Sequence, residues 1–193
     1  MPRLKQFDEE AILNKAMELF WKKGFHGTSM QDLVDHLGIN RASLYNTFGD
    51  KKSLFESALA RYREINTGVL NRLLEAEPSV KEALFRMFSL SVEQSLADPD
   101  SKGCFVVNTT AGSMSGDEDT KCTLEQNKEH ITGLLLKLLE KGVLKGEIPP
   151  DKNLPELASF LFTVYNGMNV IARIKPQREE LYGVIRTALS VLD

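Results

Sequence analysis

The sequence predicts an all-α fold of about nine helices, and three observations favour it. Apolar residues recur at helical spacing, as at Ile12, Ala16, Leu19 and Phe20, which share one face of a helix. Capping residues, glycines and prolines separate these periodic segments, as in "EAEPS" and "KGEIPPDKN". No segment alternates apolar and polar residues as a half-buried strand does, and no internal repeat is visible.

The first two helices are marked at both ends. Asp8 caps the first helix, and Gly24 ends it. Thr28 and Gln31 have the spacing of a capping box at the start of the second helix. Gly38 suits the left-handed position at which the second helix ends.

A third helix, capped by Asn40, runs through Thr47, and Asp50 caps a fourth helix at about 50–74. Two short helices joined around a glycine form a helix-turn-helix, whose second helix can enter a DNA major groove. The same geometry also occurs in packed helical domains that bind no DNA.

The rest of the chain reads as five further helices, at residues 79–96, 103–114, 117–141, 154–174 and 176–192. These five helices predict a larger helical domain at residues 53–193. The fourth helix joins it to a helix-turn-helix domain at residues 1–52. The stretch "LASFLFTVYNGMNVIARI" is apolar on nearly every side, so we expect that helix to be buried all round.

Composition sets limits on the class of protein. Of the 193 residues, 42% are hydrophobic, which is enough for a sizeable core. No apolar run approaches the roughly 18 residues of a membrane span, and the N-terminus has no signal-peptide pattern. The two cysteines make no disulfide framework, so we expect a cytoplasmic protein with free thiols and no membrane partner.

Charge gives a weaker indication. The net charge is −3, with +1 on residues 1–64 and −4 on residues 65–193. A nucleic-acid contact must therefore come from a local patch and not from bulk charge.

The third helix carries the candidate base-reading residues. With Leu44 taken as inward, a rotation of about 100° per residue also turns Asn40 and Phe48 inward and leaves a small, hydrogen-bonding outer face. Such side chains read base edges and thymine methyl groups in the major groove. The predicted base contacts are Arg41, Ala42, Ser43 and Asn46.

Candidate phosphate contacts flank this helix. Free N–H groups at helix starts attract anions, and ammonium or hydroxyl groups there add further contacts. The predicted phosphate contacts are Thr28, Ser29, Tyr45, Lys51 and Lys52, with Arg3 and Lys5 as a short basic arm.

The stretch "AMELFWKKGFHGTSMQDLVDHLGINRASLYNTFGDKKSLFESAL" closely resembles the DNA-binding domain of the tetracycline-repressor (TetR) family. The resemblance covers residues 16–59 and joins A-x-x-L-F, G-F-x-G-T-S, L-G-[IV] and L-Y-x-x-F-x-x-K-x-x-L at the family's spacing. It implies a homodimeric, ligand-responsive transcription regulator in which Thr28, Tyr45 and Lys51 or Lys52 hold phosphates. Gly49-Asp50 departs from the pattern and removes one possible phosphate contact.

In this family the C-terminal part forms the dimer and binds the ligand. The last two predicted helices can form a four-helix bundle with their twofold copies; the alternative is an ordinary core within one chain. The predicted dimer residues are Phe160, Val164, Gly167, Ile171, Leu181, Val184, Ile185 and Ala188. Gly167 is expected at a close helix contact.

A ligand pocket between helices is the default place for an effector, although aromatic and methionine stripes more often mark core. The predicted pocket residues are Phe85, Phe88, Cys104, Phe105, Asn108, Met114, Phe162, Tyr165 and Met168. Asn108 hydrogen-bonds either a ligand or the backbone.

The segment "SKGCFVVNTT" resembles a G-C-[LF]-x-x-N-T segment of one subgroup of the family. Cys104 is expected in the first turn of its helix, where N–H groups stabilise a thiolate. An electrophile or oxidant sensor is one interpretation, with Cys104 alkylated before Cys122. A small, buried, inert cysteine is the other.

No catalytic set, metal-ligand spacing, phosphate-binding glycine loop or cofactor motif is visible, so we expect neither an enzyme nor a metalloprotein. The function predicted is a repressor that binds a palindromic double-stranded operator as a homodimer and is released by a small-molecule effector. The alternatives are an activator of the same fold, a thiol-based sensor acting through Cys104, and a small-molecule carrier with a vestigial helix-turn-helix.

Overall fold

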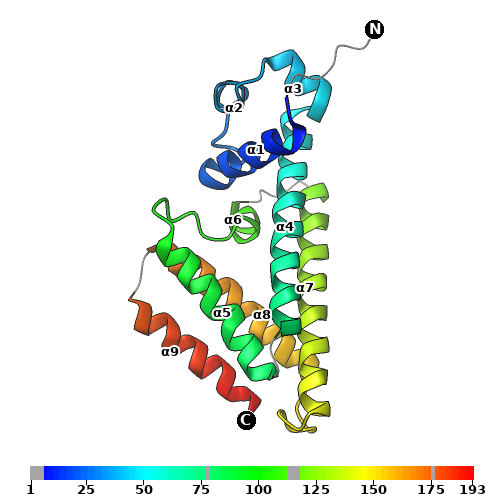
Figure 1. The fold of residues 1–193 in the computed structure, drawn as a ribbon, viewed down its shortest axis with the longest axis vertical. Coiled ribbons are helices and arrows are strands. Elements are labelled where there is room, and N and C mark those ends of the chain that lie inside the picture. Colours follow the sequence, from blue (N-terminus) through cyan, green and yellow to red (C-terminus); the bar gives the residue numbers. More distant parts are fainter. Residues whose placement is uncertain (1–6, 77–78, 113–117, 175–176) are drawn as a thin grey trace. The chain divides into compact units, whose positions relative to one another are not determined.

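The computed structural model describes residues 7–76, 79–112, 118–174 and 177–193, and every regular element in these residues is a helix (Figure 1). This confirms the predicted all-α fold. The α-helices are α1 Glu9–Lys23, α2 Met30–Leu37, α3 Arg41–Phe48, α4 Lys51–Ala76, α5 Val80–Ala97, α6 Phe105–Gly112, α7 Glu118–Leu144, α8 Leu154–Ile171 and α9 Arg178–Leu189. Two 3₁₀ turns, η1 Ala172–Ile174 and η2 Ser190–Leu192, extend α8 and α9.

The chain divides into two compact units, Met1–Ile65 and Asn66–Asp193. The α4 helix starts in the first unit and ends in the second. The boundary falls later than residue 52, because the first half of α4 packs on α1: the ring of Phe55 meets that of Phe20 edge to face, with centroids 5.2 Å apart.

The first unit is a small bundle around leucine and phenylalanine side chains. Leu33 of α2, Leu44 of α3 and Leu54 of α4 are each fully buried. Between α2 and α3, Gly38 has φ 70° in the left-handed region, and its N–H donates to the Val34 carbonyl at 3.1 Å. This turn ends α2, and α3 begins at Arg41 only a few residues later, as the helix-turn-helix prediction requires.

The predicted capping box of α2 is wrong by one residue. Ser29 is the N-cap: its hydroxyl accepts the Asp32 N–H at 3.0 Å, and Asp32 Oδ2 accepts the Ser29 N–H at 2.8 Å. Hydrogen bonds from Lys23 and Ser29 hold the pKa of Asp32 well below its usual range. Thr28 is buried instead, and its hydroxyl donates to the Gly24 carbonyl at 2.7 Å.

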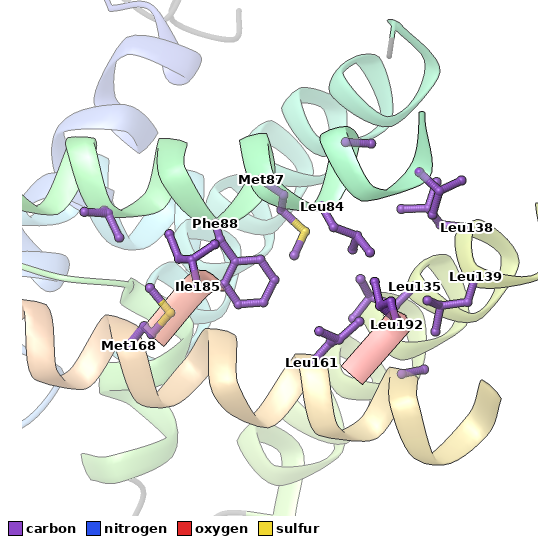
Figure 2. Packing of buried hydrophobic residues seen from close by; sticks show 14 of the residues in the cluster. Leu84, Met87, Phe88, Leu135, Leu138, Leu139, Leu161, Met168, Ile185 and Leu192 are labelled. Carbon is purple, nitrogen blue, oxygen red and sulfur yellow. The ribbon is translucent and has the colours of Figure 1, made fainter. Parts of the chain in front are cut away.

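The second unit has its own core between α5, α7, α8 and α9. The α7 helix packs on α8, and α5 packs on both α8 and α9. Figure 2 shows side chains from these helices and from η2 meeting in one cluster. Its fully or almost fully buried members include Leu84, Met87, Phe88, Leu135, Leu138, Leu139, Leu161, Met168, Ile185 and Leu192.

The prediction that α8 is buried all round is wrong for the single chain. Phe160, Val170 and Ile171 expose 41%, 49% and 44% of their surface, whereas Leu161 and Met168 on the opposite side are buried. The helix therefore has one face in the core and one apolar face without cover in the described chain.

Three predicted dimer residues in α9 also need correction. Leu181, Ile185 and Ala188 are buried within their own subunit, and the first two belong to its core. Amphipathic spacing correctly marked an apolar face there, but α5 of the same chain covers that face. These side chains are not available to a partner subunit.

Candidate DNA-binding surface and effector region

The α3 helix presents a polar face beside a buried anchor. Arg41, Ala42 and Asn46 are exposed, and Ser43 is half-buried. Leu44 is fully buried, so it fixes which side of the helix faces out. The four predicted base-contacting residues thus lie on the outward side or its flank.

The start of α3 is fixed by a side-chain cap. Asn40 Oδ1 accepts the Ser43 N–H at 2.8 Å, which satisfies one of the unpaired donors of the first turn. The prediction that Asn40 faces inward is wrong, since the residue is exposed and caps the helix. Tyr45 is 41% exposed, and the Arg41 guanidinium carbon lies 5.8 Å from its ring centroid.

The two lysines at the start of α4 have different surroundings. The Lys51 ammonium lies 4.2 Å from the centroid of the Phe25 ring. Partial burial of this ammonium lowers the pKa of Lys51, and the negative charge of Asp32 opposes that shift. The Lys52 ammonium lies 3.7 Å from a carboxylate oxygen of Glu56 on the next turn. The side chain of Lys52 is 40% exposed.

Asp50 holds the N-terminus of α4, as predicted. Its carboxylate accepts the N–H and the hydroxyl of Ser53 at 2.8 and 2.9 Å. These two hydrogen bonds lower the pKa of Asp50. A side-chain acid therefore already caps this helix start beside the two lysines.

The two hydroxyl-bearing residues before α2, Thr28 and Ser29, differ in whether they can reach a phosphate. The hydroxyl and N–H of Thr28 both donate within the chain, to the Gly24 and Phe25 carbonyls. Because both donors are used, Thr28 supports the turn in this conformation and offers no donor to a phosphate. Ser29 is exposed at the helix start. Arg3 and Lys5 lie outside the described residues.

An open groove that the sequence did not predict lies elsewhere on the first unit. Its volume is about 630 Å³. The residues that line it are Glu9, Glu10, Leu13, Phe48, Ser57, Ala60, Arg61 and Glu64. Carboxylates outnumber the single guanidinium, so this groove is a poor site for nucleic acid phosphates.

In the second unit, several predicted pocket residues are core residues. Phe88 and Phe105 are each 1% exposed, and Met168 is 6% exposed. The Phe88 ring meets the Tyr165 ring edge to face, with centroids 5.7 Å apart. Phe85 and Phe162 are half-buried against the same core. Met114 lies outside the described residues.

Cys104 lies among polar groups from three helices. It immediately precedes α6, and its carbonyl accepts the Asn108 N–H at 2.9 Å, so it stands one position before the first turn predicted for it. Burial raises the pKa of Tyr165 to about 12; a charged Cys104 adds to the rise, and hydrogen bonds with Ser91 and Asn169 oppose it. Cys104 as a whole residue is half-buried.

Sequence reasoning missed Ser91 and Asn169. The Ser91 hydroxyl donates to Asn169 Oδ1 at 3.1 Å, and Asn169 Nδ2 donates to the Tyr165 carbonyl at 2.9 Å. Asn169 is only 5% exposed. An asparagine inside the apolar run "YNGMNVIA" was the available indication of a buried polar group.

Asn108 bonds the protein itself, as the second of its two interpretations had it. Its Nδ2 donates to the Lys102 carbonyl at 2.5 Å, and its Oδ1 accepts from Arg173 at 3.2 Å. Both ends of the amide are therefore used in this conformation.

The outward face of α8 continues into η1 and is joined by α9. Ile174 is 76% exposed and Val184 is 40% exposed. A Cβ built on Gly167 would meet nothing within 4 Å. The described residues contain no group of three or more His, Cys, Asp or Glu side chains able to hold a metal. Among all the described residues of the chain, no helix is long and apolar enough to cross a membrane.

Two family profiles match the chain. The profile described as "Bacterial regulatory proteins, tetR family" matches residues 12–58, and "Tetracyclin repressor-like, C-terminal domain" matches residues 80–188. The chain is 35% identical over 198 residues to the uncharacterized HTH-type transcriptional regulator YezE of Bacillus subtilis, with 100% of both chains covered. It is 34% identical over 190 residues to the HTH-type transcriptional repressor ComR of Escherichia coli, covering 97% of this chain and 90% of ComR.

A solved structure has the same fold over almost the whole length. It is a cysteine mutant of the TetR family transcriptional regulator CifR in complex with 26-bp double-strand operator DNA. The TM-score is 0.90 and the identity 29%, with 99% of this chain and 100% of that chain covered. The helix-turn-helix geometry, the two matched profiles and these relatives agree, and the chain therefore belongs to the TetR family of helix-turn-helix transcriptional regulators.

Proposed function

We propose that this regulator is a repressor that binds a palindromic operator as a homodimer and leaves it when a small molecule binds the second unit. The observation that carries the proposal is the outward face of α3, where Ala42 and Asn46 are exposed around the buried anchor Leu44. A small residue lets the helix approach the groove floor, and an amide can read an adenine edge. ComR, a relative at 34% identity, is a repressor by its name, and the CifR structure contains operator DNA.

The apolar outward face of α8 supports a homodimer. Phe160, Val164, Gly167 and Ile171 recur at a spacing of three or four residues, which puts them on one side of the helix. Exposed apolar patches rimmed by polar residues mark protein contacts, and a twofold copy offers the same face in return. Leu181, Ile185 and Ala188 take no part, because the subunit's own core holds them.

The path from effector to operator runs along α4. This helix begins beside α3 and continues into the second unit without a break. A ligand that shifts α4 in the second unit moves its other end as well. Two recognition helices held one DNA turn apart lose their match to the half-sites when that spacing changes.

Asn46→Ala is expected to relax sequence preference. An operator is first isolated by gel shift with fragmented genomic DNA. The same gel shift tests whether the protein binds DNA at all, because a small-molecule carrier with a vestigial helix-turn-helix would shift no fragment. On that operator the variant should lose about 1–3 kcal/mol for each base contact removed. Its affinity for unrelated DNA should stay close to that of the parent, because no phosphate contact has been removed.

Lys52→Ala is the matched control for Asn46→Ala. It should weaken binding about equally on all sequences and reduce the salt slope by about one counterion per lost contact. Titrations of both variants at several salt concentrations distinguish the two classes of contact. If Asn46→Ala kept the parent's full preference for the operator, α3 would not be the reading helix.

A thiol-based response is a second candidate, favoured by the position of Cys104. The residue stands directly before α6, where the N–H groups of the first turn attract negative charge, and the buried Tyr165 hydroxyl lies close by. Alkylation adds bulk at this point and would displace the start of α6. Cys122 is exposed on α7 and has no comparable surroundings among the described contacts.

N-ethylmaleimide is expected to release the operator by acting on Cys104. The operator affinity of the parent and of Cys122→Ser should fall by the 5–150-fold typical of about 1–3 kcal/mol of allosteric coupling. Cys104→Ser should remain bound. Gel shifts before and after alkylation, with the modified sites located by mass spectrometry, measure this. Release that persists in Cys104→Ser, or an adduct on Cys104 without release, would contradict the sensor.

A further inference from the structure

The turn that leads into α6 is tied to the end of α8 by a single side chain. Arg173 in η1 donates from Nε to the Ser101 carbonyl at 3.4 Å and from Nη1 to Asn108 Oδ1 at 3.2 Å. Ser101 lies before α6 and Asn108 lies inside it. One guanidinium therefore holds the chain on both sides of Cys104, the residue immediately before α6.

The hydrogen bonds continue from this guanidinium to the end of α5. Asn108 Nδ2 donates to the Lys102 carbonyl, and the Lys102 N–H donates to Asp98 Oδ2 at 2.7 Å. Asp98 is the C-cap of α5, and its own N–H donates to the Gln94 carbonyl. A continuous chain of polar contacts thus links α5, the turn at residues 98–104, α6 and η1.

The backbone of this turn is in a conformation that needs support. Ser101 has φ 51°, and it is the one non-glycine with positive φ among the described residues. Gly103 has φ 66°, and a Cβ there would lie 2.9 Å from Cγ and 3.0 Å from Cδ of Arg173. The aliphatic part of Arg173 therefore packs directly on the residue before Cys104. Glycine adopts a positive φ without strain, but a serine such as Ser101 persists in this conformation only where its surroundings hold it.

We infer that Arg173 is a latch: it fixes the turn at residues 98–104 and the first turn of α6, and so limits access to the thiol of Cys104. The α6 helix has eight residues, too few for a helix to be stable without outside contacts. Releasing the guanidinium removes two donors and frees the turn to open, which exposes Cys104. The regulatory meaning of the latch rests on the proposed thiol response, but the latch itself is measurable without DNA.

Arg173→Met tests the latch in the full-length chain. Methionine keeps an unbranched stem to pack on Gly103 and removes both donors. Hydrogen–deuterium exchange of the amides in residues 105–112 should become about tenfold faster, as expected for one or two lost hydrogen bonds. The rate at which N-ethylmaleimide modifies Cys104 should rise by a similar factor, whereas Cys122 in the same molecule should react at its original rate.

Arg178→Met is the control, because Arg178 also anchors α9 to a neighbouring helix by a guanidinium, 2.7 Å from Glu93 on α5. It should change neither the exchange of α6 nor the reactivity of Cys104. Gly103→Ala should act like Arg173→Met, since its Cβ needs the space that the arginine stem occupies. Unchanged exchange in α6, or unchanged alkylation of Cys104, in both latch variants overturns the inference. Faster alkylation without operator release would leave the latch standing and reject only the thiol response.

Discussion

Gly167→Trp is expected to turn the proposed homodimer into folded monomers. Gly167 sits on the outward face of α8 between Val164 and Ile171, and no atom lies within 4 Å of a Cβ built on it. The added side chain therefore leaves the helix into open space within its own subunit. Across a twofold interface, the same side chain enters twice into space filled by the partner, and such overpacking costs about 1–3 kcal/mol or more per site.

Multi-angle light scattering of the purified variant measures the mass directly, and far-UV circular dichroism checks that the helices are intact. Gly133→Trp is the matched control: Gly133 lies in α7, and a Cβ there also meets nothing within 4 Å. This control should remain dimeric. An intact dimer of Gly167→Trp at micromolar concentration would remove α8 from the interface.

Loss of the dimer should appear in DNA binding as well. Two linked recognition helices gain roughly 10²–10⁴-fold over one, because the second half-site binds at high effective concentration. Gly167→Trp should lose most of this factor on the full operator. On a single half-site the variant and the parent should bind alike, since α3 is unchanged.

The helix-turn-helix was predictable because its determinants are local. Gly38 and Asn40 fix the turn through their own backbone and side chain, and Leu44 fixes the rotation of α3. The misplaced capping box has an equally local cause. Thr28-Ser29 followed by Gln31-Asp32 permits two registers, and the carboxylate of Asp32 accepts hydrogen bonds better than the amide of Gln31.

The outward apolar face of α8 was only partly predictable, because apolar spacing does not identify what covers a face. The periodicity of α9 marked Ile185 correctly as buried, but the covering helix is α5 of the same chain. In α8, the continuous apolar sequence did not show which side faces the core: Leu161 is buried there, whereas Phe160 is exposed. A helix that is apolar all round has no polar side to indicate its orientation.

The polar contacts around Cys104 were beyond sequence reasoning for another reason. Ser91 and Arg173 lie far from Cys104 in the chain, as does Asn169. They come together because α8 packs against both α5 and α6. The sequence around each of these residues shows nothing unusual. Their contacts near Cys104 depend on tertiary packing, which local residue spacing does not encode.

Phe88→Ala is expected to lower the free energy of unfolding by about 3–5 kcal/mol, the usual cost of truncating a buried aromatic ring. The sequence left two interpretations of Phe88, a wall of the effector pocket or ordinary core. Its ring is 1% exposed, meets the ring of Tyr165 edge to face at 5.7 Å, and lies between Leu84, Met168 and Ile185 in the core cluster (Figure 2). Truncation therefore leaves a cavity that well-packed neighbours cannot fill.

Denaturant unfolding at one fixed protein concentration measures the loss, because the stability of a dimer depends on concentration. Leu144→Ala is the control: Leu144 is 88% exposed at the end of α7, and its truncation should stay within about 0.5 kcal/mol. A ring that lined an open effector pocket would already have solvent or ligand on one side, so its removal would cost much less than a core ring. A loss for Phe88→Ala no larger than for Leu144→Ala would therefore return Phe88 to the pocket wall and contradict its place in the core.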